Sequence, residues 1–247
     1  MAGDPNLPTT ESLALACVRG GADILELGIP FSDPIADGPE IQKAGQRALR
    51  AGTRPRDVLG LASHIRRASD VPLVLMTYLN PVLAIGLGDF ADLASTAGVD
   101  GVIIPDLSFE ESDGLAATFS AHGIDAIQLV APSTPPDRAQ AIALASRGFL
   151  YVVARYGTTG VRTSLPEDLT SRLAALKKAT SIPLAVGFGV STPEHVRALR
   201  DAGADGVVVG SAIVRKATED PSPAAVERFV AALASVTRAP VLPGSSS

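Results

Sequence analysis

A short turn motif recurs four times along this chain, and it constrains the fold more than any other feature of the sequence. In each copy a helix-like stretch ends in glycine, an apolar residue and aspartate, and a β-rich segment follows: Gly21-Ala22-Asp23, Gly98-Val99-Asp100, Gly123-Ile124-Asp125 and Gly203-Ala204-Asp205. A glycine after the last helical residue accepts the left-handed conformation that ends a helix. The motif therefore predicts helix-to-strand turns, repeated along the chain.

Seven strands are predicted in total, and we expect them to be parallel. Two further segments enter at Val71-Pro72 and Ile182-Pro183, and another covers residues 149–154, so strands begin near residues 23, 72, 100, 125, 149, 183 and 205. A helical pattern separates each strand from the next, whereas antiparallel hairpins would need turns of about two to five residues. The strand sequences are mostly apolar throughout, which is typical of strands covered on both faces.

These βα units favour an α/β fold, a TIM (β/α)8-type barrel. Such a barrel has eight strands, so the first strand is missing here, because residues 1–8 are too few and too polar to form a buried one. A Rossmann sheet is the alternative, although no GxGxxG follows the first visible strand. The length of 247 residues and the 46% of apolar residues suit one barrel domain over residues 1–236. Residues 237–247 should form a disordered tail.

Charge and cysteine content exclude several classes of protein. The formal net charge is −5, so no basic surface is expected for nucleic acid or anionic lipid. No apolar run approaches the ~18 residues that a membrane span needs. Cys17 is the only cysteine, no signal peptide is visible, and no metal-ligand spacing occurs, so we expect a cytoplasmic protein without a bound metal.

The segment ELGIPFSDPIADGP, residues 26–39, carries two candidate catalytic carboxylates. Glu26 alternates with Leu25 and Leu27 in an apolar strand, so its side chain points either into the barrel or toward the helices. In either place burial would raise its pKa, as for a general acid or base. The alternative is a structural role, as a salt-bridged core glutamate or as a strand-end residue in solvent. Asp37 lies in the loop after the strand, at the end of the barrel where active sites lie.

Asp33, in the same loop, has an equally good structural interpretation, because beside Ser32 and Pro34 its side chain could hold a turn. Glycine turns after the last two strands, at Gly189 and at Gly210-Ser211, indicate a phosphate site, since loops there end on helix N-termini. They could instead serve only as tight turns, and Ser191 with Glu194 fits a helix capping box. The glycine-rich stretch 155–162, after the strand bearing Tyr151, suits a mobile lid or a surface loop.

Taken together, ELGIPFSDPIADGP, GVIIPDLS, YVVARYGTTG, GFGVS and VGSAIV resemble, in order and spacing, the tryptophan synthase alpha subunit family, over residues 2–229. The resemblance implies a (β/α)8 barrel that cleaves indole-3-glycerol phosphate to indole and glyceraldehyde 3-phosphate without a cofactor. It also implies a partner, the PLP-dependent beta subunit, in an α2β2-type complex.

Site residues are carried over from the resemblance position by position. Glu26 corresponds to the acid/base glutamate of the family, Asp37 to its second catalytic carboxylate, and Tyr151 to a tyrosine that lines the site. The implied substrate-binding residues are apolar contacts for the indole ring and polar or glycine contacts for the phosphate end: Ile103, Leu129, Val153, Thr159, Gly160, Gly189, Gly210 and Ser211.

The chain departs from the family pattern in two places. The helix and strand that precede AGDP in the family are absent, so the strands near 23 and 205 should have unpaired edges. Tyr156, with Ala154 and Thr158, alters the lid. Either the first residue of this sequence lies downstream of the true start of the protein, or the chain is a divergent or inactive paralogue. Two other functions therefore stay open: a stand-alone indole-releasing lyase, and an inactive regulatory partner of the beta subunit.

Overall fold

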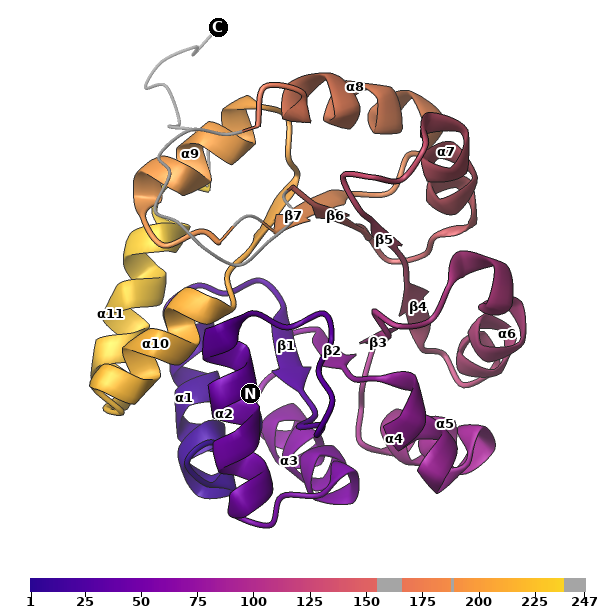
Figure 1. Cartoon of the computed structure of the whole chain (residues 1–247). Coiled ribbons are helices and arrows are strands. Elements are labelled where there is room, and N and C mark those ends of the chain that lie inside the picture. The colour runs from indigo at the N-terminus through magenta and orange to yellow at the C-terminus, as the bar shows by residue number, and fades with distance from the viewer. Residues whose placement is uncertain (155–165, 188, 238–247) are drawn as a thin grey trace, which may run out of the picture.

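The computed structural model describes residues 1–154, 166–187 and 189–237. Its strands are all parallel and follow chain order around a ring (Figure 1). They are β1 (Leu25–Gly28), β2 (Leu73–Met76), β3 (Gly101–Ile103), β4 (Asp125–Ile127), β5 (Leu129–Val130), β6 (Leu150–Val153), β7 (Leu184–Gly187) and β8 (Gly206–Val208).

The predicted number of strands is confirmed over the described residues. β4 and β5 are two halves of the strand expected from residue 125, and the ladder continues between them, because the Tyr151 amide donates to the Gln128 carbonyl (3.0 Å). The order β1-β2-β3-β4 and β5-β6-β7-β8 contains no reversal. The switch point of a Rossmann sheet is therefore missing, and the fold is an α/β barrel of the TIM type.

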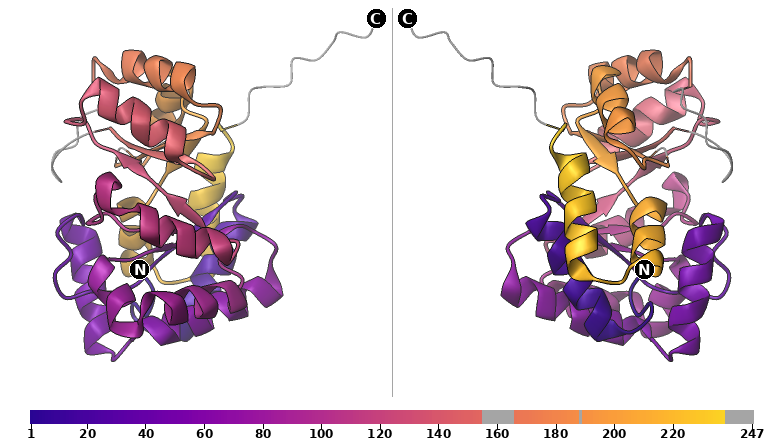
Figure 2. Two further views of the ribbon diagram at one scale, coloured as in Figure 1. Left: turned by 90° about the vertical axis from the view of Figure 1, so that its right-hand side faces the viewer. Right: turned by 90° about the vertical axis from the view of Figure 1, so that its left-hand side faces the viewer.

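Helices surround the ring of strands (Figures 1 and 2). They are α1 (Leu7–Arg19), α2 (Pro39–Arg50), α3 (Pro55–Ala68), α4 (Leu79–Ile85), α5 (Leu87–Thr96), α6 (Asp113–Ala121), α7 (Pro136–Ala145), α8 (Leu169–Ala179), α9 (Pro193–Asp201), α10 (Ser211–Glu219) and α11 (Pro223–Ala234), with a short 3-10 helix at Phe109–Glu111.

Local turn chemistry explains where four of these helices end and where two begin. Each of the four motif glycines has a positive φ, between 74° and 101°, as the sequence predicted. The α1 cap is Asn6, whose side chain accepts from the Thr9 amide. The α9 cap is Thr192, so the capping box suggested for Ser191 is wrong. In both helices a polar side chain at the cap satisfies a free amide of the first turn.

Apolar side chains form an outer and an inner layer. The outer layer packs strands against helices and includes Leu25 and Leu27 of β1, which are 6% and 5% exposed. The inner layer fills the barrel with Val74, Ile103 and Ile127, next to partly buried side chains such as Tyr151. This alternation along each strand decides which side chains can reach the interior.

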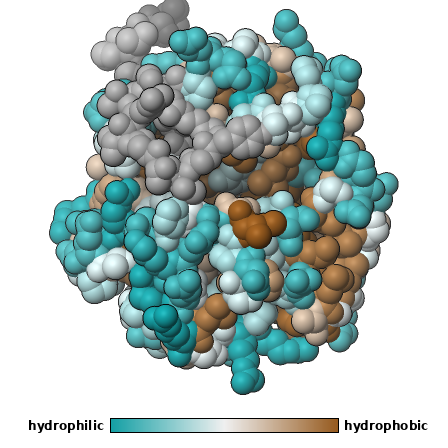
Figure 3. Space-filling model, viewed as in Figure 1, coloured by the Kyte–Doolittle hydropathy of each residue, from teal (hydrophilic) through white to brown (hydrophobic). Residues whose placement is uncertain are grey.

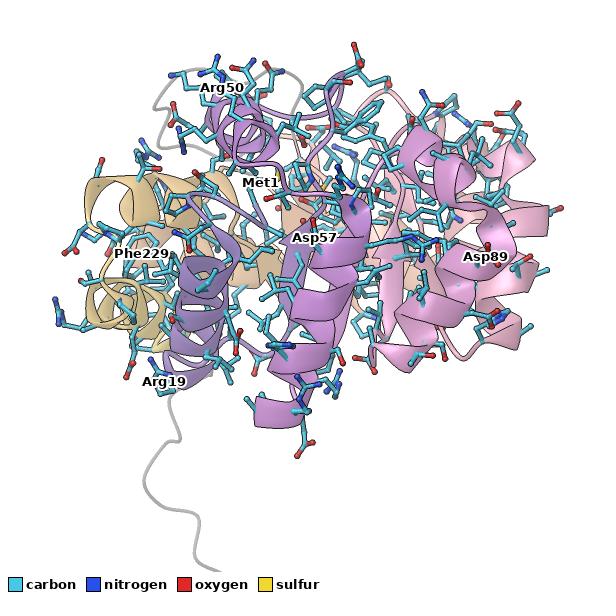
Figure 4. The ribbon with its side chains drawn as sticks, turned by 90° about the horizontal axis from the view of Figure 1, so that it is seen from below. Met1, Arg19, Arg50, Asp57, Asp89 and Phe229 are labelled. Carbon is cyan, nitrogen blue, oxygen red and sulfur yellow. The ribbon has the colours of Figure 1, made fainter. Side chains whose placement is uncertain are left out.

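The first residues of the chain lie across the open end of the ring. The Ala2 amide donates to the Gly28 carbonyl (2.9 Å), and Asp4 forms an ion pair with Arg47 of α2 (2.7 Å). Met1 lies between Gly28 of β1 and Gly45 of α2 (Figure 4). As expected, this segment is a loop and contributes no strand.

Candidate active site

One cavity of about 520 Å³ brings most of the predicted site residues together. In space-filling view, apolar residues gather at the centre of one face and continue to its right-hand side (Figure 3). Six of the predicted residues line the cavity: Glu26, Asp37, Tyr151, Gly189, Gly210 and Ser211. They come from the two ends of the chain and from β6, so only the ring arrangement of the strands brings them to one cavity.

Glu26 points into the barrel. Its neighbours Leu25 and Leu27 face the helices, so the alternation of β1 turns the carboxyl group inward. The side chain borders the cavity, and solvent can reach it although protein surrounds it. Burial raises the pKa of Glu26 to about 7, the Met1 amino group opposes this shift, and the Asp37 carboxylate adds to it. Near neutral pH this group can therefore both donate and accept a proton.

Asp37 lies at the rim, in the loop between β1 and α2. Burial raises the pKa of its carboxyl group, whereas a hydrogen bond from the Tyr78 hydroxyl and the charge of the Met1 amino group lower it. The same hydroxyl accepts from the Ala36 amide (3.1 Å). Asp33, by contrast, accepts a hydrogen bond from Ser32, is exposed and does not line the cavity. Of the two loop aspartates, the structure places only Asp37 at the site.

Tyr78 is a site residue that the sequence analysis missed. It lies two residues after the end of β2, is 3% exposed, and its ring packs against Phe31 at a centroid distance of 5.2 Å. It therefore fixes the loop of Asp37 at two points, the backbone at Ala36 and the ring of Phe31. A signal was available, because an aromatic residue with a hydroxyl group at the carboxyl end of a barrel strand lies where such barrels carry their site residues.

Tyr151 stands inside the barrel beside Gly187. A side chain at position 187 would collide with it, since an added Cβ would lie 2.6 Å from the Tyr151 hydroxyl oxygen. Burial raises the pKa of Tyr151, and the charges of Glu26 and Asp37 raise it further. The hydroxyl group therefore stays protonated and can donate a hydrogen bond within the cavity.

The last two βα turns form the other side of the cavity. Gly189 has a φ of 68°, and Gly210 precedes α10, which has no side-chain cap. The first amides of α10 therefore have no partner within the helix and, with the helix dipole, favour an anion. Ser211 is the first residue of that helix. This arrangement suits the phosphate site predicted from the glycine turns.

Three predicted ring contacts do not border the cavity. Ile103 is fully buried and packs with Val74 and Ile127, while Leu129 packs against the same inner layer. Val153 is partly buried on β6. Val74, Met76 and Phe149 line the cavity instead, and the sequence analysis did not single them out. Thr159, Gly160 and Tyr156, with the expected lid, lie outside the described residues, as do residues 238–247 of the expected tail.

The fold and the site together define a class: an α/β-barrel protein whose cavity holds a carboxyl group of raised pKa inside the barrel and the glycine turns that follow the last two strands. The sequence profile of the tryptophan synthase alpha chain matches residues 1–244. The chain belongs to the tryptophan synthase alpha chain family.

Relatives and solved structures agree with this assignment. The tryptophan synthase alpha chain of Solibacter usitatus is 49% identical over 226 residues, which are 92% of this chain and 84% of the relative. The solved Mycobacterium tuberculosis tryptophan synthase superposes with a TM-score of 0.89 at 38% identity, covering 96% of this chain and 90% of that one. A mutant alpha subunit from Pyrococcus furiosus gives 0.85 at 40% identity, covering 94% of each chain.

Proposed function

We propose that this chain is a carbon–carbon lyase that cleaves indole-3-glycerol phosphate to indole and glyceraldehyde 3-phosphate, as the alpha component of tryptophan biosynthesis. The observation that supports this most is the shared cavity of Glu26, Asp37 and the amino end of α10. It provides a proton donor, a second carboxylate and an anion site within one space. No helix among the described residues is long and apolar enough to cross a membrane; we propose the cytoplasm as the setting.

The reaction is a retro-aldol cleavage, and each group has a defined part in the proposal. Neutral Glu26 protonates C3 of the indole ring, and the bond from C3 to the glyceryl chain then breaks. The adjacent glyceryl hydroxyl loses its proton to a base, for which ionised Glu26 is the candidate, and becomes the aldehyde. The Asp37 carboxylate accepts a hydrogen bond from the indole N–H and so stabilises the positive charge of the C3-protonated ring. The substrate phosphate binds at Gly189, Gly210 and Ser211.

The direct test is an assay of indole release from indole-3-glycerol phosphate by the purified chain, with and without a beta subunit. We expect turnover, and we expect the beta subunit to increase it. A folded chain that binds the beta subunit but neither binds a non-cleavable phosphorylated indole nor releases indole would contradict the proposal and favour the inactive partner. Turnover that the beta subunit leaves unchanged would favour the stand-alone lyase.

The substitution Tyr78→Phe tests whether Tyr78 positions the loop that carries Asp37. Removing the hydroxyl group frees the loop at Ala36 and removes the hydrogen bond that lowers the pKa of Asp37. We expect kcat for indole release to fall about tenfold, the effect of losing one hydrogen bond to a charged group. The acid limb of the pH–rate profile should move to higher pH, because Asp37 then takes up its proton more readily. An unchanged acid limb would contradict this role.

The partner proposed for this chain is the PLP-dependent beta subunit. Ile35 is 81% exposed, in the same loop as Asp37, so an apolar side chain projects beside the cavity. We expect Ile35→Asp to weaken beta-subunit binding at least about tenfold in a titration, because a charge would be buried without a partner. The matched control is Leu144→Asp on α7, which is 69% exposed. Equal effects of both substitutions would exclude the loop as a docking surface.

A further inference from the structure

A second cavity, of about 200 Å³, lies on the outside of the barrel between α6 and α7. The two helices follow one another around the ring (Figure 1), but α6 packs against α5 and α7 packs against α8. The apolar core divides at the same place, since Phe119 of α6 belongs to one buried cluster and Ile142 of α7 to another. We call this cavity the α6–α7 pocket. It shares no lining residue with the cavity of Glu26.

Two residues of the strand layer leave space for this pocket. Ile127 and Leu129 pack in the inner layer of the barrel, so alternation turns Ala126 and Gln128 toward the helices. The outward side chains of β6 and β7 are large, apolar and fully buried: Leu150, Val152, Leu184 and Val186. Beside α6 and α7, a methyl group and an amide stand in the corresponding places, and they leave the space between the two helices unfilled.

The floor of the pocket carries an amide group that has no partner. The Gln128 side chain lines the pocket, is partly buried, and forms no hydrogen bond with another described residue. A primary amide has two N–H donors and an acceptor oxygen, which match the carbonyl and the N–H of a peptide group. The walls beside it are small side chains, Ala116 and Ala117 of α6 and Ala145 of α7. The middle of the pocket therefore suits a slim ligand that contains an amide.

Opposite charges stand at the two ends of the α6–α7 pocket. Asp113 begins α6, at the carboxyl ends of the strands, whereas Arg147 follows the end of α7, at their amino ends. Both residues are exposed, and neither forms an ion pair with another described residue. From Asp113 to Ser120, which lines the pocket near the other end of α6, the helix rises about 10 Å. At the Asp113 end, Arg138 of α7 donates two hydrogen bonds of 2.7 Å to Glu110, which joins the two sides of the pocket.

We propose that the α6–α7 pocket binds a short peptide of two or three small residues with free termini. Its amino group pairs with Asp113, a peptide group bonds to the amide of Gln128, and its carboxylate pairs with Arg147. An extended chain advances about 3.3 Å per residue, so three residues span the distance between the charged ends. A free amino acid carries both charges on one carbon atom and cannot reach both ends. The alanine walls leave no room for large side chains.

The probe is trialanine with free termini, titrated into the full chain at pH 7 by isothermal titration calorimetry. The matched control is the same peptide with an acetylated amino end and an amidated carboxyl end, which keeps the peptide groups and the methyl side chains but loses both charges. We expect saturable binding of trialanine and binding at least about tenfold weaker for the blocked peptide, the effect of losing hydrogen bonds to charged groups. Equal binding of the two peptides, or no binding of trialanine, would overturn the proposal.

Variants of the chain locate the site. Arg147→Gln removes the charge of an exposed residue and should weaken trialanine binding about tenfold, while Arg56→Gln, at an exposed arginine of α3, should leave it unchanged. Gln128→Leu removes the amide and keeps a side chain of similar size, so it should weaken binding of trialanine several-fold. If Arg147→Gln and Arg56→Gln change the affinity equally, or if neither Arg147→Gln nor Gln128→Leu changes it, the peptide does not bind in the α6–α7 pocket and the proposal is wrong.

Discussion

Glu26→Gln is expected to reduce kcat for indole release by about 10²- to 10⁴-fold, the range that a positioned general acid or base contributes. The amide has nearly the same shape as the carboxyl group but has no acidic proton to give to C3 of indole. Glu26 lies inside the barrel and borders the cavity. No other described carboxyl group of the cavity combines an inward position on a strand with a pKa near 7.

Binding of the substrate should survive this substitution. In the proposed mechanism the phosphate end binds at the turns of Gly189 and Gly210, which line the cavity from the other end of the chain. A non-cleavable phosphorylated indole should therefore bind to Glu26→Gln with an affinity within a few-fold of the unsubstituted chain. Full turnover by the variant would remove Glu26 from the mechanism, whereas loss of both binding and turnover would indicate a structural role.

The pH dependence of kcat/KM should report the same group. Glu26 must be protonated to act as the acid, and its pKa in the free protein is about 7. The rate should therefore be highest below that pH and fall as the pH rises through about 7 and the carboxyl group ionises. The fall should be absent from the residual activity of Glu26→Gln. A rate that rises through neutral pH would mean that the ionised form is the one needed first.

Asp37→Asn is the second large effect that we expect, with kcat lowered by about 10²- to 10³-fold, as for the loss of a group that stabilises charge in the transition state. The positive charge on the indole nitrogen appears only after C3 is protonated, so kcat should fall more than the affinity for substrate.

The control for Asp37→Asn is Asp33→Asn, in the same loop. Asp33 is exposed, bonds to Ser32 and does not line the cavity. This variant should keep its kcat, as measured in the same assay of indole release. If both substitutions lower kcat equally, the effect comes from the loop and not from the charge at the site.

The strands were predictable because the signals that place them are local. A glycine with positive φ ends a helix through its own backbone, so Gly21, Gly98 and Gly203 mark where strands follow whatever surrounds them. Glu26 could be identified on the same basis, as the one charge in an apolar strand. The direction of its side chain was left open, because alternation gives two faces and only the packing of Leu25 and Leu27 on the helices selects one.

Contacts between distant segments could not be predicted in this way. Tyr78 acts on a loop 42 residues earlier, through a hydrogen bond to Ala36, and no local pattern in the sequence encodes that pairing. The same holds for Ile103, a predicted ring contact that lies in the packed inner layer and does not border the cavity. Whether a side chain lines a cavity depends on its neighbours across the barrel.

The sequence by itself determined the number and order of the βα units, the two carboxylates and the glycine turns, because each depends on residues adjacent in the chain. Tertiary structure alone decided that Glu26 faces inward and that Asp37 rather than Asp33 reaches the cavity. The physical reason is that burial, pKa and cavity shape arise from atoms that come together only when the strands form their ring.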